Sequence, residues 1–114
     1  MTDYQLKRVA KALGTYVVVN SEGKLVNGFG IPVGLDYFLT PYASRLLQDF
    51  LVAEGFEVFK LEKYKPTGVW HIEISSLNDL GQPGHATLGS GPTSQEALLD
   101  ACVKYIEQRE GKDE

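Results

Sequence analysis

The side chains of this sequence that most often do chemistry in proteins are two histidines, one cysteine and the carboxylates. His71 lies on the more polar face of the alternating stretch VWHIEIS, and His85 stands where a later strand-like stretch begins. A zinc site needs three or four ligands in register, and only Glu73 and Asp79 fall near the histidines. We therefore expect both histidines at a surface or at the rim of a binding site, and we predict neither a metal site nor a cofactor.

Nucleophilic catalysis has no convincing set of residues in this sequence. Cys102 falls on the apolar side of a helical pattern, which is typical of a small core residue and argues against a Cys–His pair. Ser90 stands in a Gly-Ser-Gly stretch that is too short to match G-x-S-x-G. This glycine-containing stretch also lacks the lysine and the following hydroxyl residue of a phosphate-binding loop. The carboxylates scatter over polar faces. The sequence thus predicts a protein that is not an enzyme, and a catalyst built on His71 or His85 is the least favoured alternative.

Ligand binding has more support from the aromatic side chains. Tyr37 and Tyr42 fall at the ends of expected elements, where a half-exposed ring can stack on a flat ligand or fill a pocket. Arg45 follows Tyr42 by three residues, so the two share a helix face. A tyrosine and an arginine at a helix N-terminus suit an anionic or nucleotide-like ligand. The alternative is a tyrosine that packs its ring and an arginine that is simply exposed.

The segment from Asn27 to Leu39 is irregular and yet apolar. Its glycines and Pro32 break both helix and strand patterns. Its apolar side chains are candidates for a subunit or partner contact, and they include Phe29, Ile31, Val33 and Phe38. The segment is expected to be a loop over the core edge, a binding loop or lid, or the interface of a homodimer, and the sequence leaves these alternatives open.

Hydrophobic periodicity predicts the order helix, two strands, helix, three strands, helix. The expected helices begin near Thr2 or Asp3, at Thr40 and at Thr93, each with a capping side chain, and the last of them carries the T-x-x-E form of a capping box. The strand connections between Phe56 and Gly91 are too short for crossovers. We therefore expect an α+β fold, with a mainly antiparallel sheet of about four to five strands packed with three helices. Residues 1–109 are expected to form one domain, followed by a solvated tail over 110–114.

The composition narrows the classes of partner. The formal net charge is -4, and no basic stripe of the kind that grips a phosphate backbone is visible, so nucleic-acid binding is not expected. No apolar run approaches the roughly 18 residues needed to cross a bilayer. The protein is expected to be cytoplasmic and not to bind membranes.

Two resemblances follow from these motifs. The three strands followed by GSGPTSQEALLDACVKYIE resemble the end of a double-stranded RNA-binding domain, but Ser94, Gln95 and Glu96 stand where that family has its lysine-rich cluster. Nearly the whole chain resembles the small phage and prophage domains called phage ABA-sandwich proteins. The segments that carry this resemblance are YQLKRVAKALG, LDYFLTPYASRLLQDFLVAEGFEV, GVWHIEI and GPTSQEALLDACVKY.

The second resemblance implies a non-enzymatic accessory protein that acts in the host cytoplasm. Its first expected role is a binding module that captures or blocks a host component, either a defence protein or a small nucleotide-like signal. The alternative is an assembly protein that contacts another phage protein or forms a homodimer and has no small ligand. A pocket lined by tyrosine and arginine would favour the first role, and a symmetric contact through the Asn27–Leu39 segment the second.

Overall fold

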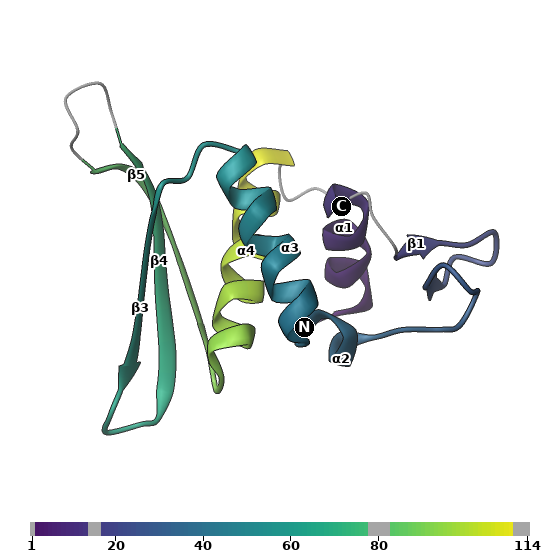
Figure 1. Cartoon of the computed structure of the whole chain (residues 1–114), viewed down its shortest axis with the longest axis horizontal. Coiled ribbons are helices and arrows are strands. Elements are labelled where there is room, and N and C mark those ends of the chain that lie inside the picture. Colours follow the sequence, from purple (N-terminus) through teal and green to yellow (C-terminus); the bar gives the residue numbers. More distant parts are fainter. Residues whose placement is uncertain (1, 14–16, 78–82, 111–114) are drawn as a thin grey trace.

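The fold is layered, with a sheet at each end and helices between them (Figure 1). The computed structural model describes residues 2–13, 17–77 and 83–110. The larger sheet is antiparallel in the order β3–β4–β5, and the smaller one pairs β1 with β2. The strands are β1 (Val18–Val19), β2 (Leu25–Val26), β3 (Val58–Tyr64), β4 (Val69–Leu77) and β5 (Pro83–Gly91). The helices are α1 (Asp3–Leu13), α2 (Leu35–Phe38), α3 (Pro41–Ala53) and α4 (Ser94–Glu110).

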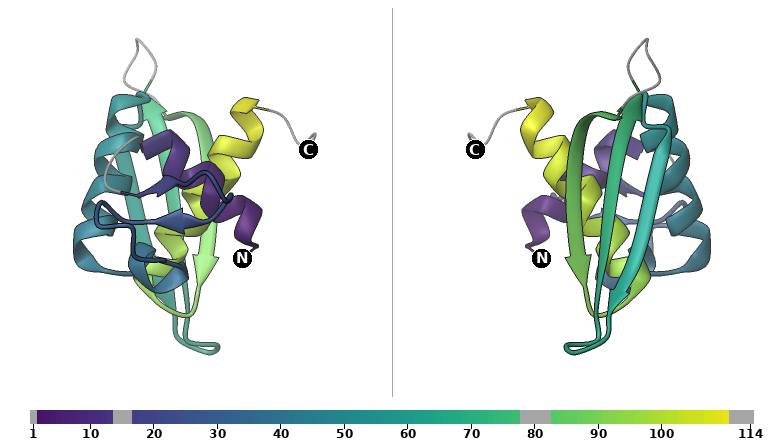
Figure 2. Two further views of the ribbon diagram at one scale, coloured as in Figure 1. Left: turned by 90° about the vertical axis from the view of Figure 1, so that its right-hand side faces the viewer. Right: turned by 90° about the vertical axis from the view of Figure 1, so that its left-hand side faces the viewer.

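The helices cover only one face of the three-stranded sheet. Helix α4 packs directly on β4 and β5, α3 packs beside α4, and α1 contacts both helices and β1. No described element lies over the opposite face of the sheet, which is seen from the front on the right of Figure 2. The larger sheet therefore has a core face and an outer face, and the alternation along its strands decides which side chains lie on each.

The α+β class and the antiparallel sheet are confirmed, but two details differ from the expectation. The strands form two separate sheets, because the short pair β1–β2 lies against α1, on the far side of the helices from β3–β5 (Figure 1). A fourth helix, α2, forms within the apolar irregular segment. It is one turn long, and Gly34 before it supplies no side-chain cap, so neither periodicity nor capping could predict it.

A threonine hydroxyl caps each of the three predicted helix starts, and at α1 the cap is Thr2 and not Asp3. The Thr40 hydroxyl accepts from Ala43 N at 3.2 Å, with proline at the first helical position. At α1, Thr2 Oγ1 accepts from Gln5 N at 3.2 Å and Thr2 N donates to Gln5 Oε1 at 2.9 Å, which is a complete capping box. Thr93 Oγ1 accepts from Glu96 N at 3.1 Å. Here the return bond to the Glu96 carboxylate is not formed within the described chain, so the predicted box at α4 is half complete.

Helix α4 is the centre of the core, because the sheet contacts it on one side and α1 and α3 on the other. Cys102 is fully buried there, as predicted, and burial raises the pKa of its thiol. The buried side chains of α4 are Ala97, Leu98, Leu99, Ala101, Cys102, Val103 and Ile106. They meet Ile72 and Ile74 of β4 and Leu47 and Leu51 of α3 in one cluster.

A polar cluster joins the last turns of α3 and α4. Glu54 Oε1 accepts from the Tyr105 hydroxyl at 2.6 Å and from Arg109 at 2.7 Å. The bonds from Tyr105 and Arg109 hold the pKa of the Glu54 carboxyl below its usual value, whereas desolvation, followed by the bond to Glu54, raises the pKa of Tyr105. Glu110, which was expected in a solvated tail over 110–114, is the last residue of α4, and residues 111–114 lie outside the described chain.

Candidate binding groove

The predicted tyrosine and arginine set is only partly brought together. Arg45 lies on the exposed side of α3 and lines a groove, whereas Tyr42 is half-exposed near the start of the same helix and does not line it. Tyr37 lies in α2, where its ring packs edge-to-face on Phe38 at 5.3 Å between centroids. Tyr37 thus belongs with the packing of the core, which was the alternative interpretation for a tyrosine.

The two histidines do not share a site. His71 faces outward from β4, and its ring lies edge-on to that of Tyr64, with 6.4 Å between the ring centroids. In the β4–β5 register His71 pairs with Ser90, whereas Ser75 pairs with Ala86. His85 therefore lies towards the other end of β5, roughly 16 Å along the strands at about 3.3 Å per residue. No group of three or more potential metal ligands occurs among the described residues.

The four candidate interface residues separate into two kinds. Phe29 is 90% exposed and Ile31 is 57% exposed, so both stay available for a contact. Val33 is half-buried against the core, and Phe38 is completely buried. The expectation that Phe38 lies at an interface is therefore wrong: the one-turn helix α2 directs this ring inward, where it fills the core beside α3.

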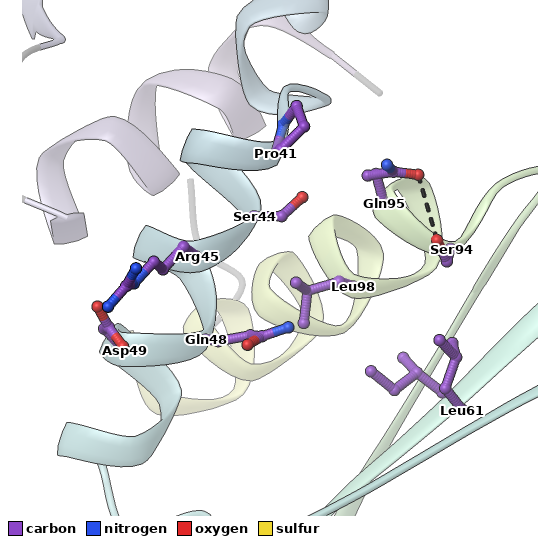
Figure 3. A pocket seen from close by; sticks show the side chains of 10 residues that line it. Pro41, Ser44, Arg45, Gln48, Asp49, Leu61, Ser94, Gln95 and Leu98 are labelled. Carbon is purple, nitrogen blue, oxygen red and sulfur yellow. Dashed lines mark hydrogen bonds between the residues drawn. The ribbon is translucent and has the colours of Figure 1, made fainter.

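A groove of about 470 Å³ opens between α3, the start of α4 and the core face of β3 (Figure 3). Leu61 of β3, Ile72 of β4 and Leu98 of α4 supply its apolar surface. Leu61 is 45% exposed although it lies on the core face, opposite Ile72 in the sheet register. The groove exists because α3 packs on α4 and leaves the core face of β3 open.

The wall of the groove is polar and mostly uncharged. Ser44 and Gln48 point from α3 across the groove towards α4, where Ser94 donates to Gln95 Oε1 at 3.2 Å (Figure 3). The Ser44 hydroxyl is buried and no described residue hydrogen-bonds to it. A buried hydroxyl without a partner is uncommon in native proteins, so Ser44 is an unsatisfied polar group in the wall of the groove.

Among the residues that line the groove, only two are charged, and both lie at its rim. Arg45 and Asp49 lie next to one another on the outer side of α3 (Figure 3). The lining residues therefore combine an apolar floor, amide and hydroxyl groups and one charge of each sign. This arrangement suits a neutral or zwitterionic polar chain better than the anionic ligand expected from Arg45 alone.

Sequence reasoning missed most of the groove. Leu61 was expected to be an ordinary strand residue, and Ser44, Gln48 and Gln95 gave no signal because single polar residues on helices are common at surfaces. One pattern could have indicated Leu61: the strand VFKLEKY has charged residues on both of its faces, which is typical of an edge strand.

No helix in the described part of the chain is both long enough and apolar enough to span a membrane. Comparisons with protein-family models, with curated proteins and with solved structures gave no match. The groove is accordingly interpreted from its own geometry and chemistry.

Proposed function

We propose that this protein is a non-enzymatic binding module and that the groove between α3, α4 and β3 is its binding surface. The observation that carries the proposal is the half-exposed Leu61 at the base of a polar-walled groove, on the face of the sheet that is otherwise covered by helices. An apolar surface with a few convergent polar groups is the usual composition of a ligand site.

The experiment is a binding screen followed by a matched pair of variants. Extended peptides and nucleotides are screened by two-dimensional NMR of the labelled protein, and the hits are measured again with Leu61→Arg and with Leu88→Arg. Leu88 is exposed on the outer face of the same sheet, so its variant controls for charge and for loss of a leucine. We expect Leu61→Arg to abolish binding and Leu88→Arg to leave it unchanged. Hits that shift amides elsewhere and bind both variants equally would refute the groove as the site.

The resemblance to phage domains suggests a setting for this module, in which the bound molecule is a host component that is captured or blocked. We propose this role on the resemblance alone. It predicts that expression in a bacterial host protects an infecting phage, or weakens a defence system, in a manner that Leu61→Arg removes. Protection that persists in the Leu61→Arg variant would separate the phage role from the groove.

A second candidate function, homo-oligomeric assembly, is favoured by Phe29 and Ile31. These two large apolar side chains lie two residues apart and are both well exposed. If they form a dimer contact, the native mass in solution will be that of a dimer and Phe29→Ser will return it to a monomer. A parent protein that is monomeric at high concentration would argue against this function.

A further inference from the structure

The edge of β3 that borders the groove is open. β3 is an outer strand of the sheet, and β4 occupies its other side through seven registered pairs from Val58–Ser75 to Tyr64–Val69. No described strand pairs with the open edge. β5 is the other outer strand of the sheet, and its core face is covered by α4, whereas the core face of β3 is left open. The row of backbone amides and carbonyls along β3 is therefore available to another strand.

The helices are also spaced for a sheet that is wider than the one present. Adjacent helices are about 8–10 Å apart and adjacent strands about 4.8 Å apart, so two helices cover roughly four strands. Here α3 and α4 face three strands. Figure 2 shows α3 projecting past the β3 edge, beyond the last strand of the sheet. A fourth strand laid against β3 would run beneath α3 and occupy the groove.

The side chains of β3 define what that strand must carry. Leu61, at the middle of β3, faces the groove. Lys60 and Glu62 face outward, and the Lys60 Nζ atom lies 3.6 Å from Glu62 Oε1. A residue opposite Leu61 enters the apolar part of the groove. The residues opposite Lys60 and Glu62 are favoured as acidic and basic respectively, because directly opposed charges of unlike sign stabilise a pair of strands.

An antiparallel partner strand therefore reads basic, apolar, acidic from its N-terminus. The segment Lys60-Leu61-Glu62 itself has this order, so a peptide with the β3 sequence is complementary to β3 when the two Leu61 positions are opposite. A one-residue shift would turn the apolar side chain of the peptide to the outer face, away from the groove, so the registers that keep the same side chains on the groove side differ by steps of two residues. The two nearest alternatives place Lys60 opposite Lys60 or Glu62 opposite Glu62, and like charges directly opposite one another destabilise the pair.

A complete second copy of the chain fits this edge poorly. A two-fold axis through the edge would keep both helical layers on the same side of the joined sheet. Because α3 projects past the edge (Figure 2), the two α3 helices would meet in the space that one of them needs, within the 8–10 Å that packed helices require. The geometry thus favours a strand that brings no helix with it.

We propose that the ligand of the groove is an extended polypeptide segment that adds to β3 as a fourth antiparallel strand, with an apolar residue opposite Leu61 between a basic and an acidic residue. This inference rests on the proposed function of the groove. Backbone hydrogen bonds to β3 supply affinity, and the apolar residue and the order of charges supply specificity, as in other cases of strand addition.

The test uses the full-length protein and two end-capped fluorescent peptides of identical composition. The first has the sequence EVFKLEKYK of residues 57–65, and the second, EVFELKKYK, exchanges the central lysine and glutamate. We expect the first to bind about tenfold more tightly by fluorescence anisotropy, which corresponds to two cross-strand charge pairs changed from attractive to repulsive. A protein with Lys60→Glu and Glu62→Lys together should reverse this preference.

Two further measurements distinguish strand addition from other binding. The first peptide, methylated at two adjacent backbone nitrogens in its centre, should lose binding because one of them must face β3. Binding that tolerates methylation and ignores charge order, but is lost in Leu61→Arg, would overturn strand addition and leave the groove function standing. Absence of peptide binding would overturn the inference as well, and the nucleotide arm of the screen would then decide the groove function. A doubled native mass that Leu61→Arg halves would show that the occupant is a second copy, which also overturns it.

Discussion

Replacing Gly89 by alanine tests the packing that places α4 on the sheet. Gly89 lies on the core face of β5, opposite Ile72. A Cβ atom at this position would overlap the carbonyl oxygen of Ala97 and would lie 2.6 Å from the backbone nitrogen and 2.8 Å from the Cβ of Ala101. Since these neighbours are mostly helix backbone, no side-chain rotation relieves the overlap.

The cost follows from how far α4 must move. Carbon atoms in contact are ordinarily about 3.5–4.0 Å apart, so the helix must retreat by about 1 Å, and a gap of that size removes a quarter to a half of each dispersion contact. Because α4 buries side chains against both sheet and helices, we expect a loss of about 3 kcal/mol in the free energy of unfolding, at the upper end for overpacked cores.

Urea denaturation followed by circular dichroism measures this loss. With a dependence of about 1.5 kcal/mol per molar urea, the midpoint should fall by about 2 M. Gly28→Ala is the matched control, because a Cβ there meets nothing within 4 Å and the backbone does not have a positive φ. A midpoint for Gly89→Ala equal to that of the control would refute the close approach of α4 to β5.

Three further predictions concern the core, a helix cap and pH. Phe38→Ala should cost about 4 kcal/mol in thermal or urea unfolding, because the ring is fully buried; a loss below 1 kcal/mol with a change in native mass would restore Phe38 as an interface residue. Thr93→Ala should cost about 1 kcal/mol through the lost bond to Glu96 N, and Thr93→Ser, which keeps the hydroxyl, should cost much less. The pKa of Glu54 in the folded protein is lowered from the ordinary value of 4.5. The ionised carboxylate therefore stabilises the fold above pH 4.5, and this stabilisation disappears as the pH falls through the folded pKa. The free energy of unfolding, measured from pH 7 to pH 3, should therefore fall less steeply in Glu54→Gln than in the parent. At pH 7 the variant should be less stable than the parent by about 1 kcal/mol. Parallel pH profiles for parent and variant would contradict this role of Glu54.

Local residue patterns predicted the elements well wherever the pattern was long or capped. Thr40 followed by Pro41 defined the start of α3, and the alternation around Ile72 defined β4 and its two faces. The same reasoning failed at Phe38. Its helix is one turn long, and the direction in which a side chain points from one turn depends on the elements packed around it.

The role of Gly89 shows another limit. In the sequence, Gly89 and Gly91 flank Ser90 near the end of a strand-like stretch, and β5 ends at Gly91. In the structure the missing side chain of Gly89 also lets α4 approach the sheet, because its Cβ position coincides with helix backbone. A sequence does not distinguish a glycine that ends a strand from one that lets a helix pack closely on the sheet, because glycine has no side chain whose type could indicate its role.

The sequence by itself determined the α+β class, the starts of α1, α3 and α4, and the burial of Cys102. These properties depend on residues close together in the chain, through periodicity, capping and alternation. Only the tertiary structure decided that the strands form two sheets and that Leu61 lies beneath a groove. The groove arises from the position of α3, which follows its contacts with α4 and α1 and so extends past β3. That displacement is set by packing between segments distant in sequence, and no local pattern of residues encodes it.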